Sequence, residues 1–238
     1  MKPPPSTLAY ALGRKSVPLF MKAQWIAKSL AGSETEKIEA EFKMGCLLAQ
    51  VYEEKVSAFA NNRLSAIAKK LTDCLQNKAR RFCFKCDHSG LLNALAFPGG
   101  FIYLSEVLFD HCGEDRNAIA FVLAHEIAHT IHRDANRRFL TKAAITGLSR
   151  TRMYGTNPAI QSILSHLVQQ GYSREQEFRA DRFAVALTQA AGFDPAGGCR
   201  LFASLESGES ANHYFSSHPA FADRIMRIQQ RMTERAES

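Results

Sequence analysis

The sequence predicts an α+β protein that is mostly helical, with a small antiparallel β-sheet or hairpin beside one central helix. Over most of the chain, apolar residues recur at three- and four-residue spacing, which is typical of amphipathic helices. Residues 80–104 instead alternate in polarity around a Pro-Gly-Gly sequence, which indicates strands joined by a turn. Residues 118–124 are all apolar, so the helix that contains them should be buried on nearly every side.

Each element follows from these patterns in turn. Scaffold helices are expected at residues 35–60 and 62–76, and strands at 81–87, 94–97 and 101–104. The central helix is expected at 114–132, where Glu114 and Asp115 favour a helix start. Residues 136–145 could extend it, and further helices are expected at 159–170, 172–185, 193–205 and near the C-terminus.

Composition fits an ordinary globular protein and limits the classes of partner. Of 238 residues, 46% are hydrophobic and 22% charged, which is enough apolar material for a sizeable core. The net charge is +7, and a basic balance can indicate nucleic acid or an anionic membrane surface. Because no zinc-finger spacing, RNA-binding signature or long Lys/Arg run accompanies the charge, we expect no nucleic-acid partner.

The first 33 residues differ from the rest of the chain. Residues 1–32 contain five basic residues and no acidic one, and residues 17–31 mix apolar side chains with lysines. This stretch could lie on an anionic membrane. Packing against the rest of the protein is favoured, since Pro18 interrupts the apolar face. With neither a signal-peptide core nor an apolar span of ~20 residues, we expect a cytoplasmic protein, with peripheral membrane contact as the alternative.

The central helix carries the H-E-x-x-H motif, with His125, Glu126 and His129. Residues four apart on a helix share a face, so the two imidazoles can bind one metal ion. The glutamate points to the side, where it can reach a water at the metal. Burying these polar groups in an apolar helix requires partners, and a metal would satisfy them together. With eight histidines in the chain, a chance match is the alternative.

A second helix carries Glu177 and Asp181, which are four apart and share a face. Ser173 and Gln176 are placed to form a capping box at its start. Four charged residues surround the pair, so on this evidence alone a solvated face is the favoured interpretation. These four are Arg174, Glu175, Arg179 and Arg182.

Cys83 and Cys86 form a C-x-x-C sequence, which in other settings marks zinc or redox chemistry. On a strand, residues three apart face opposite sides, so ordinary strand residues are the favoured interpretation. Without a secretion signal, the six cysteines are expected to be free thiols.

Four motifs in a fixed order resemble peptidase family M48, which includes the CAAX prenyl proteases, the HtpX-type and Oma-type proteases and soluble bacterial relatives. The resemblance covers roughly residues 35–235. The motifs are H-E-x-x-H, Ser173-Arg-x-x-Glu177-x-x-Ala-Asp181, Asn93-Ala-Leu-Ala-Phe-Pro-Gly-Gly and Ser217-His-Pro-x-x-x-x-Arg224. Because no transmembrane span is found, the chain looks like a soluble bacterial-type member.

The resemblance implies a gluzincin-type zinc metallopeptidase, with residues 34–238 as its catalytic domain and residues 1–33 as a basic N-terminal extension. It implies one Zn²⁺ per chain, bound by the side chains of His125, His129 and Glu177. Glu126 would be the general base that acts on a zinc-activated water, and Asp181 would accept a hydrogen bond from a ligand histidine. Hydrolysis of peptide bonds in protein quality control is the implied function.

The chain departs from the family after the motif helix. Many relatives have Arg-His where this chain has Arg133-Asp134. Any role of that histidine is therefore absent, or is filled by Asp134 or His132.

In this family, an edge strand above the metal helix pairs with an extended polypeptide substrate, and main-chain pairing gives affinity with little sequence selectivity. Residues 94–97 or 101–104 are the candidates for this strand, and we favour the first. Its residues are Ala94, Leu95, Ala96 and Phe97.

His218 has three interpretations: a catalytic donor to the oxyanion, a zinc ligand in a latent state, or a loop residue that caps the last helix. Tyr214 is a second candidate oxyanion donor. Arg224 either pairs with a carboxylate near the site, such as Asp181, or is exposed.

Two other functions stay open. The chain could be a latent or inactive zinc-binding protein that only binds clients, against which the complete ligand set argues. It could instead be a basic membrane-surface module with a structural metal.

Overall fold

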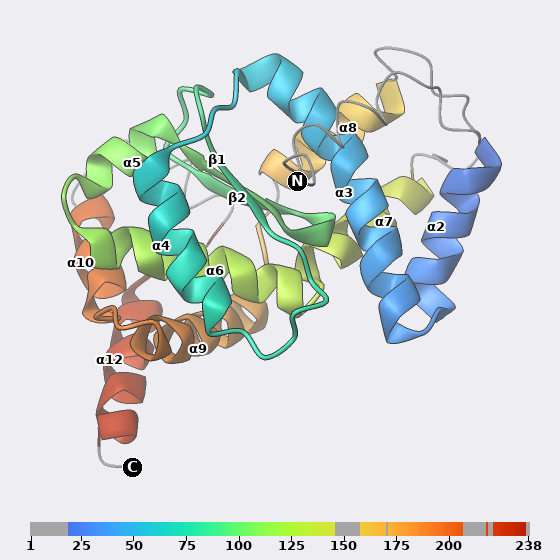
Figure 1. Cartoon of the computed structure of the whole chain (residues 1–238). Coiled ribbons are helices and arrows are strands. Elements are labelled where there is room, and N and C mark those ends of the chain that lie inside the picture. The colour runs from blue at the N-terminus through green and yellow to red at the C-terminus, as the bar shows by residue number, and fades with distance from the viewer. Residues whose placement is uncertain (1–18, 146–157, 170, 207–217, 219–220, 237–238) are drawn as a thin grey trace.

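The computed structural model describes residues 19–145, 158–169, 171–206, 218 and 221–236 (Figure 1). Within these ranges, a small sheet lies between helices that come from both ends of the chain. The helices are α2 (Leu19–Ala31), α3 (Glu34–Val56), α4 (Asn62–Asp73), α5 (Glu106–Cys112), α6 (Arg116–Ile131), α7 (Asp134–Ile145), α8 (Pro158–Gln169), α9 (Arg174–Ala190), α10 (Ala196–Glu206) and α12 (Phe221–Ala236).

The sheet has three strands, β1 (Cys83–Asp87), β2 (Ala94–Phe97) and β3 (Phe101–Ser105), in the order β1-β3-β2. β2 and β3 are antiparallel and are joined by the 3₁₀ turn Pro98–Gly100, as predicted. β1 runs parallel to β3, so the sheet is mixed and not wholly antiparallel. β3 is paired on both sides and cannot be an edge strand, which excludes residues 101–104 as the substrate strand.

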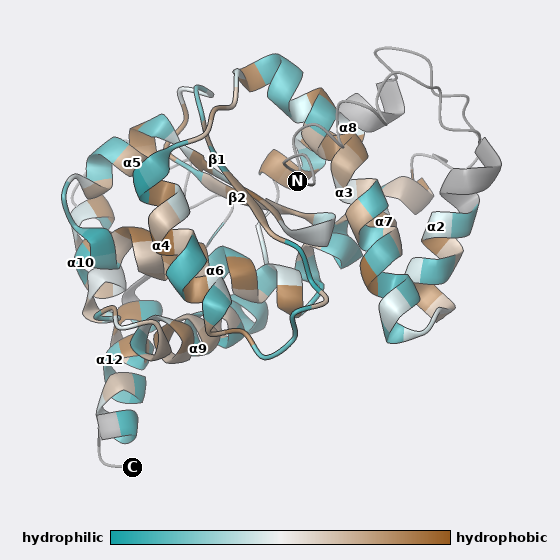
Figure 2. Cartoon of the chain, viewed as in Figure 1, coloured by the Kyte–Doolittle hydropathy of each residue, from teal (hydrophilic) through white to brown (hydrophobic). Residues whose placement is uncertain are grey.

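The two faces of the sheet belong to two apolar clusters. Ala94 and Ala96 of β2 pack into the cluster that contains α4, α6 and α9, whereas Leu95 and Phe97 pack into the cluster that contains α3, α7 and α8. This alternation is the period of two that the sequence shows, and the strands appear mostly in hydrophobic colours in Figure 2. The sheet is therefore buried on both faces.

The turn between β2 and β3 docks on α3 where Gly45 leaves room for it. A Cβ atom at Gly45 would lie 1.9 Å from the carbonyl oxygen of Pro98, so no other residue fits here without a backbone shift. Gly99 in the same turn has φ +78, a conformation that glycine adopts without strain. This contact fixes the hairpin, and with it β2, against the scaffold.

The helix predictions hold with shifted ends, except after the central helix. The expected helices at 35–60, 62–76 and 114–132 are α3, α4 and α6. Residues 136–145 do not extend α6. Instead Arg133 takes a left-handed φ of 62°, which ends one helix and lets α7 begin at Asp134.

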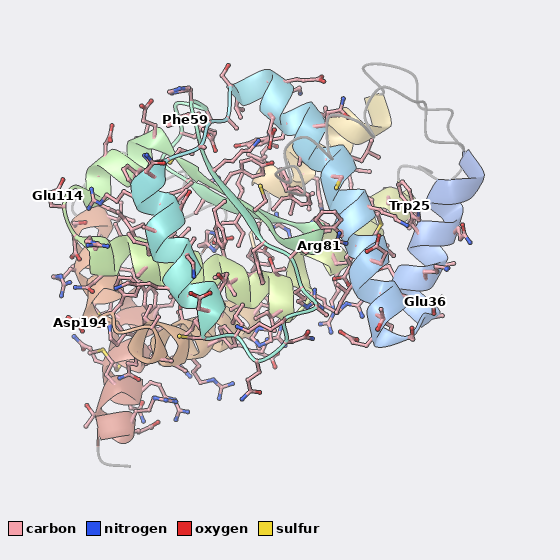
Figure 3. The ribbon with its side chains drawn as sticks, viewed as in Figure 1. Trp25, Glu36, Phe59, Arg81, Glu114 and Asp194 are labelled. Carbon is pink, nitrogen blue, oxygen red and sulfur yellow. The ribbon has the colours of Figure 1, made fainter. Side chains whose placement is uncertain are left out.

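α2 packs against the rest of the protein. Trp25, labelled in Figure 3, is buried in the same apolar cluster as residues of α3. Ser29 is also buried, and it accepts a hydrogen bond from the side chain of Asn136 on α7. These contacts support packing over membrane contact for α2, and residues 1–18 lie outside the described part.

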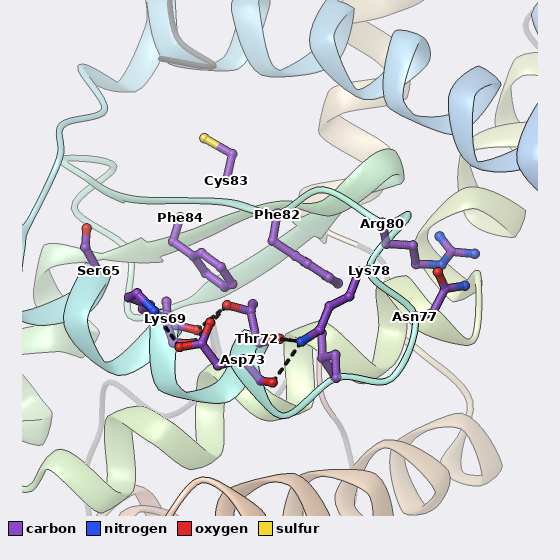
Figure 4. A pocket seen from close by; sticks show the side chains of 12 residues that line it. Ser65, Lys69, Thr72, Asp73, Asn77, Lys78, Arg80, Phe82, Cys83 and Phe84 are labelled. Carbon is purple, nitrogen blue, oxygen red and sulfur yellow. Dashed lines mark hydrogen bonds and ion pairs between the residues drawn. The ribbon is translucent and has the colours of Figure 1, made fainter. Parts of the chain in front are cut away.

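Cys83 and Cys86 are both free thiols, as predicted. Cys86 is buried and Cys83 is partly exposed. Figure 4 shows a groove between α4 and the segment that leads into β1, with Phe82 and Phe84 pointing toward α4 and Cys83 pointing away. This alternation is the ordinary geometry of a strand and offers no paired thiols.

Among the described helices, none combines the length and the apolar character needed to cross a bilayer.

Candidate metal centre

The H-E-x-x-H motif lies in the second half of α6, which is buried as predicted. His125, Glu126 and His129 are each at most 1% exposed. Asp115 caps the start of this helix, and its carboxylate accepts hydrogen bonds from the backbone N–H groups of Asn117 and Ala118. The sheet, α4, α9 and α10 all contact α6. Water therefore does not supply hydrogen bonds to the polar groups of the motif, and the protein must provide their partners.

α9 brings Glu177 to the two histidines. The capping box between Ser173 and Gln176 is present at its start, as predicted. Glu177 Oε1 lies 3.3 Å from His129 Nε2, and Glu177 Oε2 lies 3.5 Å from His125 Nε2. Glu177 is 0% exposed and Asp181 is 3% exposed, so the solvated-face interpretation of this pair is wrong.

A carboxylate orients each imidazole. Asp181 Oδ1 lies 2.9 Å from His125 Nδ1, and Asp134 Oδ2 lies 3.2 Å from His129 Nδ1. Despite burial, which raises the pKa of a carboxyl group, ionic and hydrogen-bonded neighbours hold the pKa values of Asp181 and Asp134 below their ordinary values. Because both carboxylates are ionised acceptors, each histidine donates from Nδ1 and leaves the Nε2 lone pair unshared.

The two Nε2 atoms lie only 3.0 Å apart. At this distance the two nitrogens share a cation, which is a proton on one imidazole when no metal is bound and a metal ion when one is. Burial lowers the pKa of His125, but Glu177 and Asp181 outweigh it and raise the pKa to about 9, which shows that this position attracts positive charge. Ligand atoms of His125, His129, Glu177 and His218 all lie within 4.8 Å of one another, and this donor set fits a metal ion.

Arg224 ties the carboxylates together from α12, confirming its predicted pairing with Asp181. Its Nε lies 2.7 Å from Asp181 Oδ2 and its Nη1 lies 2.7 Å from Glu177 Oε2, with the side chain 0% exposed. Burial opposes ionisation of Glu177, but His218, Arg224 and His125 hold its pKa well below the ordinary value. The buried guanidinium therefore keeps two buried carboxylates charged.

Asp134 takes part in the centre through its contact with His129. Besides His129, it accepts hydrogen bonds from the side chains of Gln176 and Arg179 on α9. His132 does not reach the centre: its ring packs against Phe183, and burial lowers its pKa to about 4. Of the two residues considered from the sequence, only Asp134 contacts a motif histidine.

Sequence reasoning missed Tyr172. Its ring stacks on that of His129 with centroids 3.6 Å apart, and Arg138 lies over the ring of Tyr172 with its Cζ 4.4 Å from the centroid. The one available signal was its position directly before the Ser173 cap, which brings it to the start of α9. Tyr172 is 5% exposed and closes the centre on this side.

His218 lies at the centre, not on the surface. Its Nδ1 is 3.0 Å from Glu177 Oε1 and its Nε2 is 3.4 Å from Glu126 Oε1. Burial lowers the pKa of His218 more than Glu177 and Glu126 raise it, so the neutral ring is favoured. Tyr214, the other candidate oxyanion donor, lies outside the described residues.

Glu126 differs from the other acids of the centre. Both carboxylate oxygens are buried, and neither has a hydrogen-bond partner among the described residues. His218 Nε2 lies 3.4 Å from Oε1 of Glu126, so the carboxylate is weakly compensated, and such groups are common where function requires them. An acceptor in this state is suited to take a proton from a water molecule beside the metal position.

β2 lies directly beside α6 and forms one edge of the sheet. All four of its residues, 94–97, are buried. Its second edge has no strand partner within the described ranges.

Comparison with known proteins agrees with this geometry. Residues 58–232 match the sequence model of Peptidase family M48. The mitochondrial metalloendopeptidase OMA1 of Schizosaccharomyces pombe is 30% identical over 152 residues, which cover 60% of this chain and 44% of that protein. The OMA1 of Saccharomyces cerevisiae is 28% identical, covering 56% and 41%. The beta-barrel assembly-enhancing protease of Yersinia pestis is 30% identical, covering 48% and 26%. The chain thus spans less than half the length of each.

Asp134→Asn should weaken metal binding about 10- to 100-fold, because the amide no longer fixes His129 as a charged acceptor does. Metal affinity is measured by competition with a chelating dye. Asp194→Asn, an exposed carboxylate outside the centre, is the control and should leave the affinity unchanged. Equal affinities in the two variants would contradict the orienting role of Asp134.

Proposed function

This chain belongs to peptidase family M48, and from that premise we propose that it is a zinc-dependent metalloendopeptidase of protein quality control. Membership of a metallopeptidase family and the cluster of two histidines and a glutamate support a metal-dependent hydrolase of peptide bonds. The observation that carries the proposal is the convergence of buried donor atoms from His125, His129 and Glu177 within 4.8 Å of one another, with the buried carboxylate of Glu126 beside them.

We propose zinc as the metal. His125, His129 and Glu177 would hold it, and two histidines with one carboxylate form the ligand set of catalytic zinc sites, whereas structural sites are closed and rich in cysteine. No cysteine belongs to the cluster that the described residues form. When bound, zinc polarises the scissile carbonyl and makes water a better nucleophile.

The side chains divide the remaining work. Glu126 accepts a proton from the attacking water and returns it to the leaving amine, the role of a general base and then a general acid. Asp181 and Asp134 hold the two imidazoles in the required tautomer and orientation. Arg224 keeps Asp181 and Glu177 charged and in place.

The substrate proposed for this site is a polypeptide in extended form. The outer edge of β2, which has no strand partner within the described ranges, would pair with the main chain of the substrate. Because this binding uses backbone hydrogen bonds, residues with small side chains such as Ala94 and Ala96 can provide it. Main-chain pairing is nearly independent of side chains and suits a protease that acts on many unfolded chains.

His218 is close enough for either of two roles in this proposal. As a donor from Nε2 it would stabilise the oxyanion, and as a further ligand it would hold the enzyme in a latent state. The cap interpretation is less favoured, because the ring lies 3.0 Å from Glu177.

The nitrogen count at the metal separates these two roles. In the zinc-loaded resting enzyme, X-ray absorption should find three histidine nitrogens if His218 is a ligand. A count of two would rule out the latent state and leave the oxyanion role, and His218→Ala then serves as the two-nitrogen reference.

Two alternatives fit less well. A client-binding protein without activity does not need a buried carboxylate that makes no hydrogen bond within the described part of the chain, as Glu126 does here. A membrane-surface module with a structural metal does not explain a glutamate beside the ligands or a ligand cluster without cysteine.

Glu126→Gln should keep its zinc and lose turnover by about 10²–10⁴-fold, because the ligands are intact but no base remains. Cleavage of casein is compared at matched zinc content with the wild type. Glu114→Gln, which changes an exposed carboxylate just before α6, is the control and should cleave normally. Normal cleavage by Glu126→Gln would overturn the assignment.

A further inference from the structure

The outer faces of α9 and α12 enclose a groove of about 610 Å³. These helices lie together at one end of the molecule, far from α2, and the last turns of α12 extend beyond its neighbours (Figure 1). Their inner faces carry Glu177, Asp181 and Arg224 of the metal centre. The groove is lined by five arginines, which are Arg174, Arg179, Arg182, Arg227 and Arg231.

Positive charge in the groove exceeds the negative charge around it. Two carboxylates, Glu175 and Glu234, line it together with the five guanidinium groups. Three of the arginines have ion-pair partners: Arg174 pairs with Asp223, Arg179 with Asp134, and Arg231 with Glu234. Arg182 and Arg227 are exposed, and within the described ranges neither has a carboxylate partner.

Phe178 positions part of this charge. Its half-exposed ring lies in the groove, with the Cζ of Arg227 4.1 Å and that of Arg174 5.9 Å from the ring centroid. A guanidinium held on an aromatic ring is already restricted, so it loses little further conformational entropy when it binds a ligand. Its planar group of N–H donors also fits a carboxylate. The groove is thus partly organised before a ligand arrives.

We propose that this groove binds an acidic segment of a polypeptide, such as a run of Asp and Glu residues. Guanidinium groups on both walls can each take a carboxylate, and the recess favours a narrow chain over a flat surface. A membrane surface fits less well, since Met226 is the one large exposed hydrophobic residue within residues 223–235 of α12. Nucleic acid fits less well, because guanidinium groups already cover the ring on which a base would stack.

This binding depends on the groove alone and does not require the proposed proteolysis. The groove also shares Arg179 with the network that holds His129 through Asp134. An acidic segment bound here would therefore lie behind the metal centre, on the same helices, and would anchor a substrate or partner away from the place of cleavage.

The test measures binding of a fluorescein-labelled oligoglutamate peptide by fluorescence anisotropy. The parent protein is the zinc-loaded full chain carrying the Glu126→Gln substitution, so that the result does not depend on cleavage. The double variant Arg182→Glu with Arg227→Glu should raise the Kd for the peptide about ten-fold or more. It replaces the two arginines that have no carboxylate partner within the described ranges with negative charges that repel the acidic peptide. Both sites are exposed, and an unchanged melting temperature shows that the fold is kept.

Lys37→Glu with Lys55→Glu on α3 is the matched control, since it changes the net charge by the same amount far from the groove. Its Kd should stay within about two-fold of the parent value. An equal loss in both double variants, or equal binding of an oligoglutamine peptide, would overturn the proposal. So would binding to vesicles of phosphatidylcholine and phosphatidylglycerol without binding to the peptide.

Discussion

The structure depends on two hydrogen bonds from imidazole to carboxylate, His125 to Asp181 and His129 to Asp134. Each bond fixes which ring nitrogen carries the proton, so that both unprotonated nitrogens point to one place. The histidines come from one helix, whereas the carboxylates come from α9 and from the start of α7. The break between α6 and α7 at Arg133 is what brings Asp134 within reach of His129.

The buried charges around these bonds are arranged in favour of a divalent cation. Four buried carboxylates, those of Glu126, Asp134, Glu177 and Asp181, stand against the guanidinium groups of Arg179 and Arg224. An unpaired buried charge costs several kcal/mol, so an excess of negative charge persists only where something compensates it. A metal with two positive charges balances this excess, which connects the fold's electrostatics to its chemistry.

A further ion pair supports the break after α6. Arg133, in its left-handed conformation, pairs with the buried carboxylate of Glu41 on α3 and donates to the backbone oxygen of Ser29 on α2. The scaffold helices at the N-terminal end therefore hold the residue next to Asp134. In this way helices that carry no catalytic group still determine the orientation of His129.

The sequence predicted the local part of this arrangement and not the long-range part. H-E-x-x-H on an apolar helix is a local pattern, so the metal helix and its two histidines could be found from spacing. Glu177 lies about fifty residues further on, where its surroundings looked like a solvated face, and only the family resemblance pointed to it. The direction of β1 and the stacking of Tyr172 depend on tertiary packing and left no local signal. Three of the groove's arginines, Arg174, Arg179 and Arg182, did show in the sequence as part of a charged face of α9, whereas Arg227 and Arg231 of α12 did not.

The central claim is that the two imidazoles share one divalent metal. Native mass spectrometry of the purified chain tests it most directly, with zinc added and the excess removed. The account predicts one zinc ion per chain in the wild type and loss of that ion in His129→Ala. A wild-type chain without metal, or a His129→Ala variant that keeps a full equivalent, would contradict it.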